Sequence, residues 1–214
     1  MKIGIMGGTF DPIHNGHLML GEYAYRDYEL DEVWFLPNGN PPHKNNPAIL
    51  KSTDDRVKMT ELAIANVPYF RISTYETDRT EPSYSYQTME HFRSVYPQHE
   101  FYFILGADSL FDIEKWRNPD QFLKLATILA AYRDDADNSR KLNGKIEYLN
   151  RKYGADIRLL RTPLLHVSSH EIREAIRNGN MKNIPVPKAV LNYIEDQHLY
   201  QGDEYDRNIN EKAY

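Results

Sequence analysis

Short uninterrupted apolar runs recur along this chain, and each is followed by a longer amphipathic segment. The runs include Val33–Leu36, Phe101–Leu105 and Ile128–Ala131. A strand that is apolar at every position is covered on both faces, as strands are in parallel sheets flanked by helices. The alternation therefore predicts a single α/β domain built on a doubly wound parallel sheet with right-handed crossovers.

Weaker signals complete this predicted domain. Further strands are expected at Ile3–Met6, Phe70–Ser73 and Ile157–Leu160. Caps and prolines mark expected helix starts near His17, Thr53, Ser83, Asn118, Asn138, Ser168 and Lys188. We expect the last helix to reach Tyr200. The domain would then span residues 1–201, and the polar segment 202–214 is expected to be a flexible tail.

The composition excludes several classes of protein. The chain has 214 residues, a formal charge of −5 and no cysteine. The negative charge argues against a general nucleic-acid or anionic-membrane binder, and the lack of cysteine excludes thiol catalysis and a disulfide framework. No apolar run approaches the roughly 20 residues of a membrane span, and the N-terminus enters a strand without a signal peptide. We expect a soluble, cytoplasmic protein.

The N-terminal stretch predicts a phosphate site. An apolar strand at Ile3–Met6 is interrupted by Gly7-Gly8, and an amphipathic helix begins at His17. The first amides of a helix have no partner within the helix, and its dipole is positive there, so anions bind at this end. His14 and His17 bring two imidazoles to the same place, and Gly16 is expected to allow a tight turn between them.

This stretch allows three interpretations. A zinc site is disfavoured because the chain has no cysteine and no glutamate stands between the two histidines. A dinucleotide-cofactor turn is disfavoured because position 12 is proline and the second strand ends Leu36-Pro37-Asn38. The third interpretation is a nucleotidyltransferase. The run from Gly8 to His17, GTFDPIHNGH, resembles the signature of the H-x-G-H adenylyl- and cytidylyltransferases.

Further motifs narrow the resemblance to one family. The segments Pro41-Pro42-His43-Lys44, Ser83-Tyr84-Ser85, Gly106-Ala107-Asp108-Ser109, Trp116 and Val167–Arg173 stand in the order of bacterial nicotinate-nucleotide adenylyltransferases. The resemblance runs from about Met1 to Tyr200. It implies a Rossmann-like fold of the nucleotidyltransferase type. It also implies transfer of an adenylyl group from ATP to nicotinate mononucleotide, giving deamido-NAD and pyrophosphate in NAD biosynthesis.

The resemblance implies a role for individual residues. The catalytic groups would be His14, His17 and Arg173. The ATP and its phosphates would be bound by Gly7, Gly8, Thr9, Phe10, Lys44, Gly106, Ser168 and Ser169. The nicotinate nucleotide would be bound by Ser83, Tyr84, Ser85, Tyr86, Asp108, Trp116 and Arg117. Mg²⁺ is expected to arrive with ATP, held mainly by phosphates, since no carboxylate cluster marks a protein-held metal.

Several of these assignments have structural alternatives. Asp108 is also a candidate helix cap, and Trp116 a candidate core or surface residue. Lys44 lies in the Pro- and Asn-rich segment 38–47, which we expect to be a functional loop. Where the family has S-S-T-x-I-R, this chain has His170 in place of the threonine. Where the family has S-Y-T, this chain has Ser85 in place of the threonine. We therefore assign no phosphate contact to His170.

Other functions stay open at this point. Within the class, the acceptor could be nicotinamide mononucleotide or the substrate of another H-x-G-H nucleotidyltransferase. From a different class, the chain could be a non-catalytic nucleotide-binding regulator, although both histidines and Arg173 are present. The sequence indicates no nucleic-acid or membrane partner and leaves a homo-oligomer possible.

Overall fold

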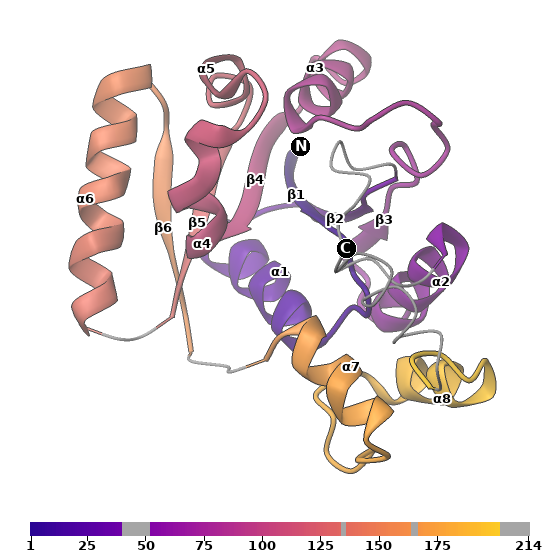
Figure 1. The fold of residues 1–214 in the computed structure, drawn as a ribbon. Coiled ribbons are helices and arrows are strands. Elements are labelled where there is room, and N and C mark those ends of the chain that lie inside the picture. Colours follow the sequence, from indigo (N-terminus) through magenta and orange to yellow (C-terminus); the bar gives the residue numbers. More distant parts are fainter. Residues whose placement is uncertain (40–51, 134–135, 164–166, 202–214) are drawn as a thin grey trace, which may run out of the picture.

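A computed structural model describes residues 1–39, 52–133, 136–163 and 167–201. Six parallel strands form one sheet in the order β3-β2-β1-β4-β5-β6 (Figure 1). Their bounds are β1 Lys2–Gly8, β2 Glu32–Pro37, β3 Phe70–Ile72, β4 Glu100–Gly106, β5 Thr127–Arg133 and β6 Ile157–Thr162. The predicted doubly wound parallel sheet is confirmed. The strand order reverses between β1 and β4, where open α/β sheets bind their ligands.

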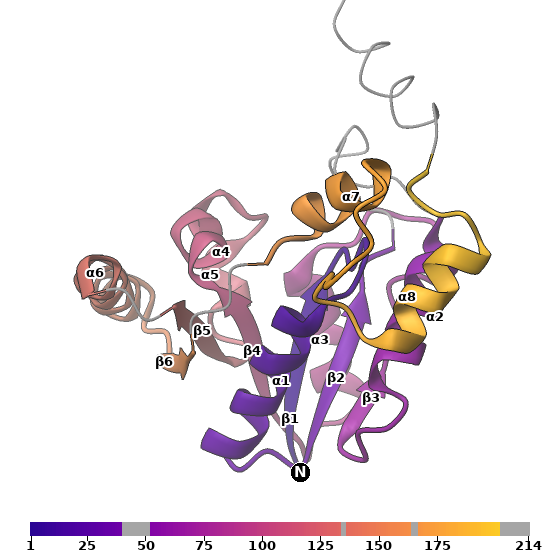
Figure 2. The same ribbon diagram turned by 90° about the horizontal axis from the view of Figure 1, so that it is seen from below.

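Helices cover both faces of the sheet (Figures 1 and 2). On one face lie α1 (Asn15–Asp27), α2 (Thr53–Ile64), α7 (Ser169–Arg177) and α8 (Lys188–Asp196). The other face carries α3 (Ser85–Val95), α4 (Ala107–Asp112), the short 3₁₀ turn η1 (Ile113–Lys115), α5 (Pro119–Phe122) and α6 (Ala136–Tyr153). In the part of the chain that the structure describes, no helix combines the length and apolar character needed to cross a membrane.

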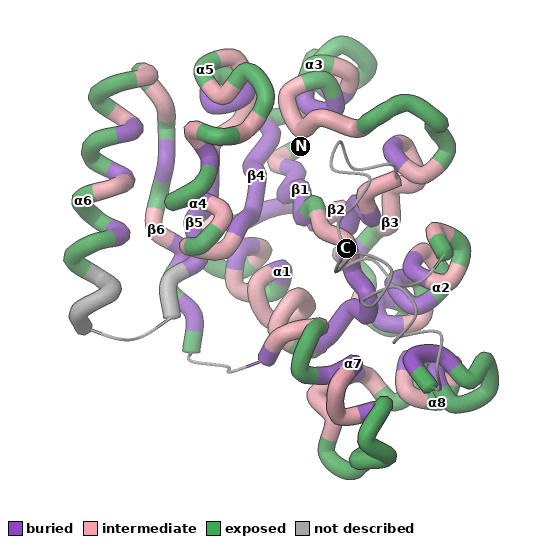
Figure 3. The backbone as a smooth tube through the Cα atoms, viewed as in Figure 1, coloured by how far each residue is buried: buried purple, intermediate pink, exposed green. Residues whose placement is uncertain are grey.

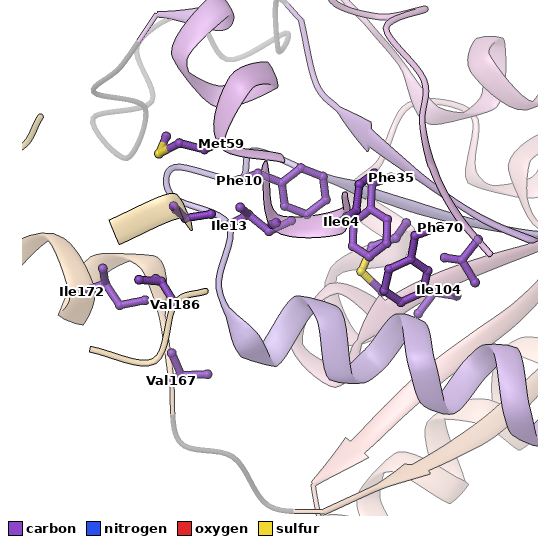
Figure 4. Close-up of a cluster of buried hydrophobic side chains, with 14 of the residues drawn as sticks. Phe10, Ile13, Phe35, Met59, Ile64, Phe70, Ile104, Val167, Ile172 and Val186 are labelled. Atoms are coloured by element: carbon purple, nitrogen blue, oxygen red, sulfur yellow. The ribbon is translucent and has the colours of Figure 1, made fainter. Parts of the chain in front are cut away.

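Two apolar clusters explain the uninterrupted strand patterns. Along β4, Phe103 and Leu105 enter one cluster, while Ile104 between them enters the cluster on the opposite face. Figure 3 shows this buried character along the strands, with exposed residues on the outer sides of the helices. Figure 4 shows part of the cluster beneath α1, α2 and α7, where Phe10 and Ile13 of the N-terminal motif are core residues.

Several element boundaries differ from the sequence expectation. Strand β1 continues through Gly7 and Gly8, which pair with Leu36 and Pro37, instead of breaking there. Helix α1 begins at Asn15, so His17 lies in its first turn. In the Gly106-Ala107-Asp108-Ser109 motif, Gly106 ends β4 and the other three residues begin α4. Helix α8 ends at Asp196, since Gln197 and the residues after it leave the helical conformation.

The inward face of α2 was predicted in part. The sequence favours Val57, Leu62, Ala63 and Ile64 on this face. Ala63 and Ile64 are buried and Leu62 packs against the core, whereas Val57 is only partly buried. The buried side chains are Arg56, Met59, Thr60, Ala63 and Ile64. These positions recur at spacings of three and four, as on one side of a helix. The buried face begins with the charged Arg56 and includes the polar Thr60, so apolar residues alone do not mark it.

Candidate functional site

A cleft opens at the carboxyl ends of β1 and β4, where the strand order reverses. Its volume is about 1560 Å³. The ends of the two strands form its floor, the starts of α1, α3, α4 and α7 reach its walls, and the segment between η1 and α5 lines one side. A cleft at this point of a doubly wound sheet is the expected place for a nucleotide.

Most of the predicted site residues meet in this cleft. Residues of the predicted phosphate and nucleotide sites that line it are Gly7, Gly8, Thr9, His14, His17, Gly106, Ser168, Ser169, Ser83, Tyr84, Ser85, Asp108, Trp116 and Arg117. These residues come from distant parts of the sequence, and the crossovers of the sheet bring them together. Phe10, Tyr86 and Arg173 are not among the lining residues. Lys44 lies outside the described residues, as do most of the predicted 38–47 loop and the 202–214 tail.

His14 and His17 form a stacked pair at the start of α1. Their ring centroids are 3.7 Å apart and the ring planes differ by 19°. The backbone N–H of His14, the residue before the helix, donates to Nδ1 of His17 over 3.3 Å. This contact fixes which nitrogen of His17 is an acceptor. The proton of the neutral ring is therefore on Nε2, which is then a hydrogen-bond donor.

The surroundings of His17 favour this neutral state. Burial, together with the neighbouring His14, lowers the pKa of His17 well below its usual range. At neutral pH His17 is thus an uncharged imidazole with one N–H to donate. Such a group can bind phosphate oxygens by hydrogen bonding without itself carrying charge.

The α1 terminus offers fewer free amides than the sequence suggests. The N–H of Asn15 donates to the carbonyl of Pro185 over 2.9 Å, and the N–H of His17 donates to the carbonyl of His14 over the same distance. Gly16 is also needed for a reason other than the predicted turn. A Cβ there would lie 2.7 Å from Val167 Cγ1 and 3.0 Å from Nδ1 of His14. Glycine is required because α1 packs so closely against these side chains.

Phe10 supports the site from the core. Its side chain is 1% exposed. Its ring packs edge-on against His17 at 5.0 Å and lies tilted against Phe35 at 6.0 Å. Its backbone is in the left-handed region, with φ 51°, a conformation that bulky residues hold only when packing fixes them. The side chain therefore supports His17 from the core, and a nucleotide contact of Phe10 stays a prediction.

The C-terminal part of the chain fixes the Asp11-Pro12 turn. Arg173 Nη1 donates to the carbonyl of Asp11 over 2.7 Å, and Ser169 Oγ donates to the carbonyl of Pro12 over 2.9 Å. Tyr200 donates to the carboxylate of Asp11 over 2.5 Å, and burial raises the pKa of this tyrosine. The turn that leads into His14 is thus held by α7 and by the end of the described chain.

This arrangement changes the expected role of Arg173. The sequence suggested a fork that reaches a phosphate, but the side chain is 4% exposed and points to the Asp11 carbonyl. Its Nε has no acceptor among the described residues. A guanidinium with one nitrogen unused keeps donor capacity, so a phosphate contact stays a prediction that requires this side chain to turn.

Helix α7 begins at the cleft with the predicted cap. The Ser168 hydroxyl accepts from the N–H of Glu171 over 3.2 Å, which satisfies one orphan amide. The Glu171 carboxylate accepts from the hydroxyl of Ser168 over 2.9 Å. His170 is exposed and lies 3.5 Å from the carboxylate of Glu174, away from the lining residues.

The predicted pyridine side of the cleft is built on α3 and η1. Tyr84 precedes the first residue of α3, Ser85, and both line the cleft. Trp116 follows η1, and its ring packs against Phe122 at 5.4 Å and Phe103 at 6.5 Å. Asp108 lies in the first turn of α4 instead of capping it, since the residue before the helix is Gly106.

Two buried ionic residues of the site were not predicted. Arg56 of α2 donates to the Thr9 carbonyl over 2.7 Å and to the Asn38 carbonyl over 2.8 Å, and so joins the ends of β1 and β2. Glu76 lines the cleft, accepts from the Thr88 hydroxyl over 2.7 Å, and has its pKa raised by burial. The 3.6-residue period of α2 could have identified Arg56, whereas the sequence carries no comparable signal for Glu76.

The described residues contain no group of three or more His, Cys, Asp or Glu arranged to hold a metal ion. Of the acidic residues that line the cleft, Asp108 and Asp112 belong to α4, and Glu76 comes from the segment between β3 and α3. Oxygen-rich clusters are what Mg²⁺ needs from a protein when it is held directly. These side chains therefore fit a metal that enters with phosphate ligands of its own.

Comparisons with known proteins agree with this geometry. Residues 5–175 match the model of the cytidylyltransferase-like family. A probable nicotinate-nucleotide adenylyltransferase of Lachnoclostridium phytofermentans is 43% identical over 199 residues, covering 93% of this chain and 98% of the relative. One of Clostridium tetani, named likewise, is 41% identical over 202 residues, covering 94% of this chain and 99% of the relative.

Solved structures share the fold. The Plasmodium falciparum nicotinic acid mononucleotide adenylyltransferase complexed with NaAD has a TM-score of 0.74 at 21% identity. The alignment covers 93% of this chain and 97% of that one. The same enzyme complexed with APC gives a TM-score of 0.72. At this identity the likeness supports the architecture of the sheet and its helices.

Proposed function

This chain belongs to the cytidylyltransferase-like family and, within it, to the nicotinate-nucleotide adenylyltransferases, and we propose that it transfers the adenylyl group of ATP to nicotinate mononucleotide. The products are deamido-NAD and pyrophosphate, so the reaction belongs to NAD biosynthesis. The stacked His14–His17 pair at the switch-point cleft is the observation that carries this proposal. Because ATP is the donor, we place the reaction in the cytoplasm.

The reaction needs positioning more than a protein nucleophile. A phosphate oxygen of the mononucleotide attacks the α-phosphorus of ATP, the new P–O bond forms, and the bond to the pyrophosphate oxygen breaks. Negative charge moves onto the leaving pyrophosphate, as in other phosphoryl transfers. Donors fixed beforehand, such as Nε2–H of His17, stabilise this charge without reorganising during the step.

The two substrates are assigned to opposite sides of the cleft. The carboxyl end of β1 and the start of α7 carry backbone and hydroxyl donors suited to the ATP phosphates. These donors belong to Gly7, Thr9 and Ser168. The starts of α3 and α4 and the Trp116 segment would receive the nicotinate nucleotide. Trp116 offers a flat face to a pyridine ring, and an aromatic pair contributes about 0.5–1.5 kcal/mol beyond burial.

Magnesium completes the proposal as a companion of ATP. It would supply charge neutralisation to the phosphates when bound. The scattered acidic side chains of the described cleft favour an ion held by phosphate oxygens and water. The protein residues then act on the phosphates that the ion leaves free.

A turnover assay tests the proposed function. Purified protein with Mg²⁺, ATP and nicotinate mononucleotide should release pyrophosphate, and deamido-NAD should accumulate in equal amount. Parallel assays with nicotinamide mononucleotide and with phosphopantetheine identify the other acceptors of the class. Binding of ATP without pyrophosphate release for any acceptor would instead identify a nucleotide-binding regulator.

We predict a preference for the acid over the amide acceptor. The amides of the first turn of α3, after Tyr84, and the positive end of its dipole suit a carboxylate. A charge-assisted hydrogen bond is about twice as strong as a neutral one, and donors left facing an amide nitrogen cost about 1–3 kcal/mol. Nicotinate mononucleotide should show a kcat/KM at least about tenfold above nicotinamide mononucleotide. Equal values would reject this assignment of α3.

Two glycines of the cleft give a further prediction. A Cβ at Gly16 would collide with Val167 and His14, whereas a Cβ at Gly106 meets no atom within 4 Å. Gly16→Ala should therefore cost about 1–3 kcal/mol of unfolding free energy, as overpacking does, and lower activity. Gly106→Ala should leave the denaturation midpoint in place and weaken substrate binding, since this residue lines the cleft. Equal denaturation midpoints for the two variants would contradict this reading.

A further inference from the structure

One carboxylate ties the Trp116 segment to helix α6. Glu114 of η1 accepts hydrogen bonds from Lys145 Nζ over 2.6 Å and Lys152 Nζ over 2.7 Å. The hydroxyls of Tyr148 and Tyr153 donate to it over 3.2 and 3.1 Å. All of these donors belong to α6. Hydrogen bonds from the two lysines lower the pKa of Glu114 to about 2, so the carboxylate is charged throughout the neutral range.

Glu114 is close in sequence to Trp116, which belongs to the proposed substrate site. Trp116 follows Glu114 by two positions, and its backbone N–H donates to the carbonyl of Ile113 over 3.1 Å. The turn that contains Glu114, Ile113–Lys115, is only three residues long, and short 3₁₀ turns have weak hydrogen bonding of their own. Its conformation therefore depends on contacts of its side chains, with Ile113 buried in the core and Glu114 bound to α6.

The cluster contributes more geometry than stability. Partly exposed ion pairs add little to the free energy of unfolding, because ordering long lysine side chains offsets the attraction. Helix α6 is already held by buried Leu142, Ile146 and Leu149. Several donors converging on one oxygen pair do, however, fix the position of that carboxylate with respect to the helix.

We propose that Glu114 is a positioning residue for the acceptor nucleotide: by joining η1 to α6 it holds the Trp116 ring where the pyridine ring stacks. This inference rests on the proposed function, which assigns Trp116 to the pyridine. Glu114 is not among the residues that line the cleft, so it acts through Trp116 and contacts no substrate. Loss of its charge should loosen Trp116 and leave the ATP side unchanged.

The test uses Glu114→Gln, which removes the charge and keeps the shape. The chain has two tryptophans, so a Trp34→Phe background leaves Trp116 as the sole tryptophan reporter. We expect the KM for nicotinate mononucleotide to rise at least about fivefold, with kcat and the KM for ATP within about twofold. Acrylamide should quench Trp116 more strongly than in the background protein. Lys145→Gln should shift both readouts in the same direction.

Asp156→Asn is the matched control. Asp156 also accepts from a cation and a hydroxyl, Arg158 at 2.7 Å and Thr127 at 3.0 Å. Among the described residues no hydrogen bond or ion pair joins it to η1, and it does not line the cleft. It should change neither Trp116 quenching nor the KM for the mononucleotide. If Glu114→Gln leaves both unchanged, or raises both KM values equally with a lower denaturation midpoint, the positioning role is rejected.

Failure of the proposed function gives a different pattern. Titration of Trp116 fluorescence with nicotinate mononucleotide measures binding without turnover. If the background protein shows Glu114-dependent binding but releases no pyrophosphate, the proposed function fails and the positioning role holds. If neither protein's fluorescence responds to the mononucleotide, the positioning role is rejected as well.

Discussion

Replacing His17 with alanine should lower kcat by at least about a hundredfold, the usual loss when one donor to a developing negative charge is removed. The physical reason is the state in which the fold holds this imidazole. Nδ1 accepts from the His14 N–H, and the depressed pKa keeps the ring neutral, so Nε2–H is committed as a donor. The donor strengthens its interaction as charge moves to pyrophosphate, so the KM for ATP should change far less than kcat.

Matched variants separate catalysis from folding. His17→Asn keeps an N–H donor and should recover part of the lost rate, whereas a purely structural role would leave the two variants alike. His99→Ala removes an imidazole just before β4, at the strand ends opposite the cleft, and should keep kcat within about twofold. The variants are assayed by pyrophosphate release where thermal denaturation shows them fully folded. Near-normal kcat in His17→Ala would remove His17 from the catalytic assignment.

The fold was predictable because its signals are local. Apolar runs such as Phe101–Leu105 predict strands covered on both faces, and the side chains of β4 do enter the two core clusters alternately. The motif from Gly8 to His17 likewise marks the end of a strand and the start of a helix. Boundaries were less accurate, since β1 pairs through Gly7 and Gly8 with β2. Pairing with a distant strand overrode the local preference of these glycines.

The supporting contacts of the site were not predictable in the same way. Phe10 stands inside a binding motif, but its side chain packs behind His17 instead of on the cleft. Arg173 was expected at a phosphate and donates to the Asp11 carbonyl. Both contacts depend on residues that the fold brings together from far along the chain. Sequence patterns identify which residues gather at a site more readily than which side chain points into it.

Among the residues that support the site from behind, Arg56 has the largest expected effect on the free energy of unfolding. Its side chain is 1% exposed, and its two terminal nitrogens donate to the carbonyls of Thr9 and Asn38 and to the side chains of Asn38 and Thr53. Burial lowers the pKa of Arg56 from its high usual value, yet a guanidinium stays charged. One buried cation thus satisfies backbone acceptors at the ends of two neighbouring strands.

Arg56→Met should therefore lower the free energy of unfolding by about 3–5 kcal/mol, because hydrogen bonds to a charge are lost and buried carbonyls are left unsatisfied. For a domain of this size the midpoint should fall by about 6–20 °C. Arg56→Lys should recover little, since a point charge cannot span Thr9 and Asn38 in the way a planar fork does. Arg158→Met, at an exposed ion pair with Asp156, should cost at most about 1 kcal/mol.

Urea denaturation measures the stability of these variants, and assays at a temperature where all are folded measure their activity. Thr9 and Asn38 both line the cleft, so folded Arg56→Met should also lose at least about tenfold in kcat/KM as the phosphate turn relaxes. The two losses have one origin, because the same guanidinium joins β1 to β2 and shapes the phosphate side. A stable Arg56→Met with full activity would show that other contacts fix this turn.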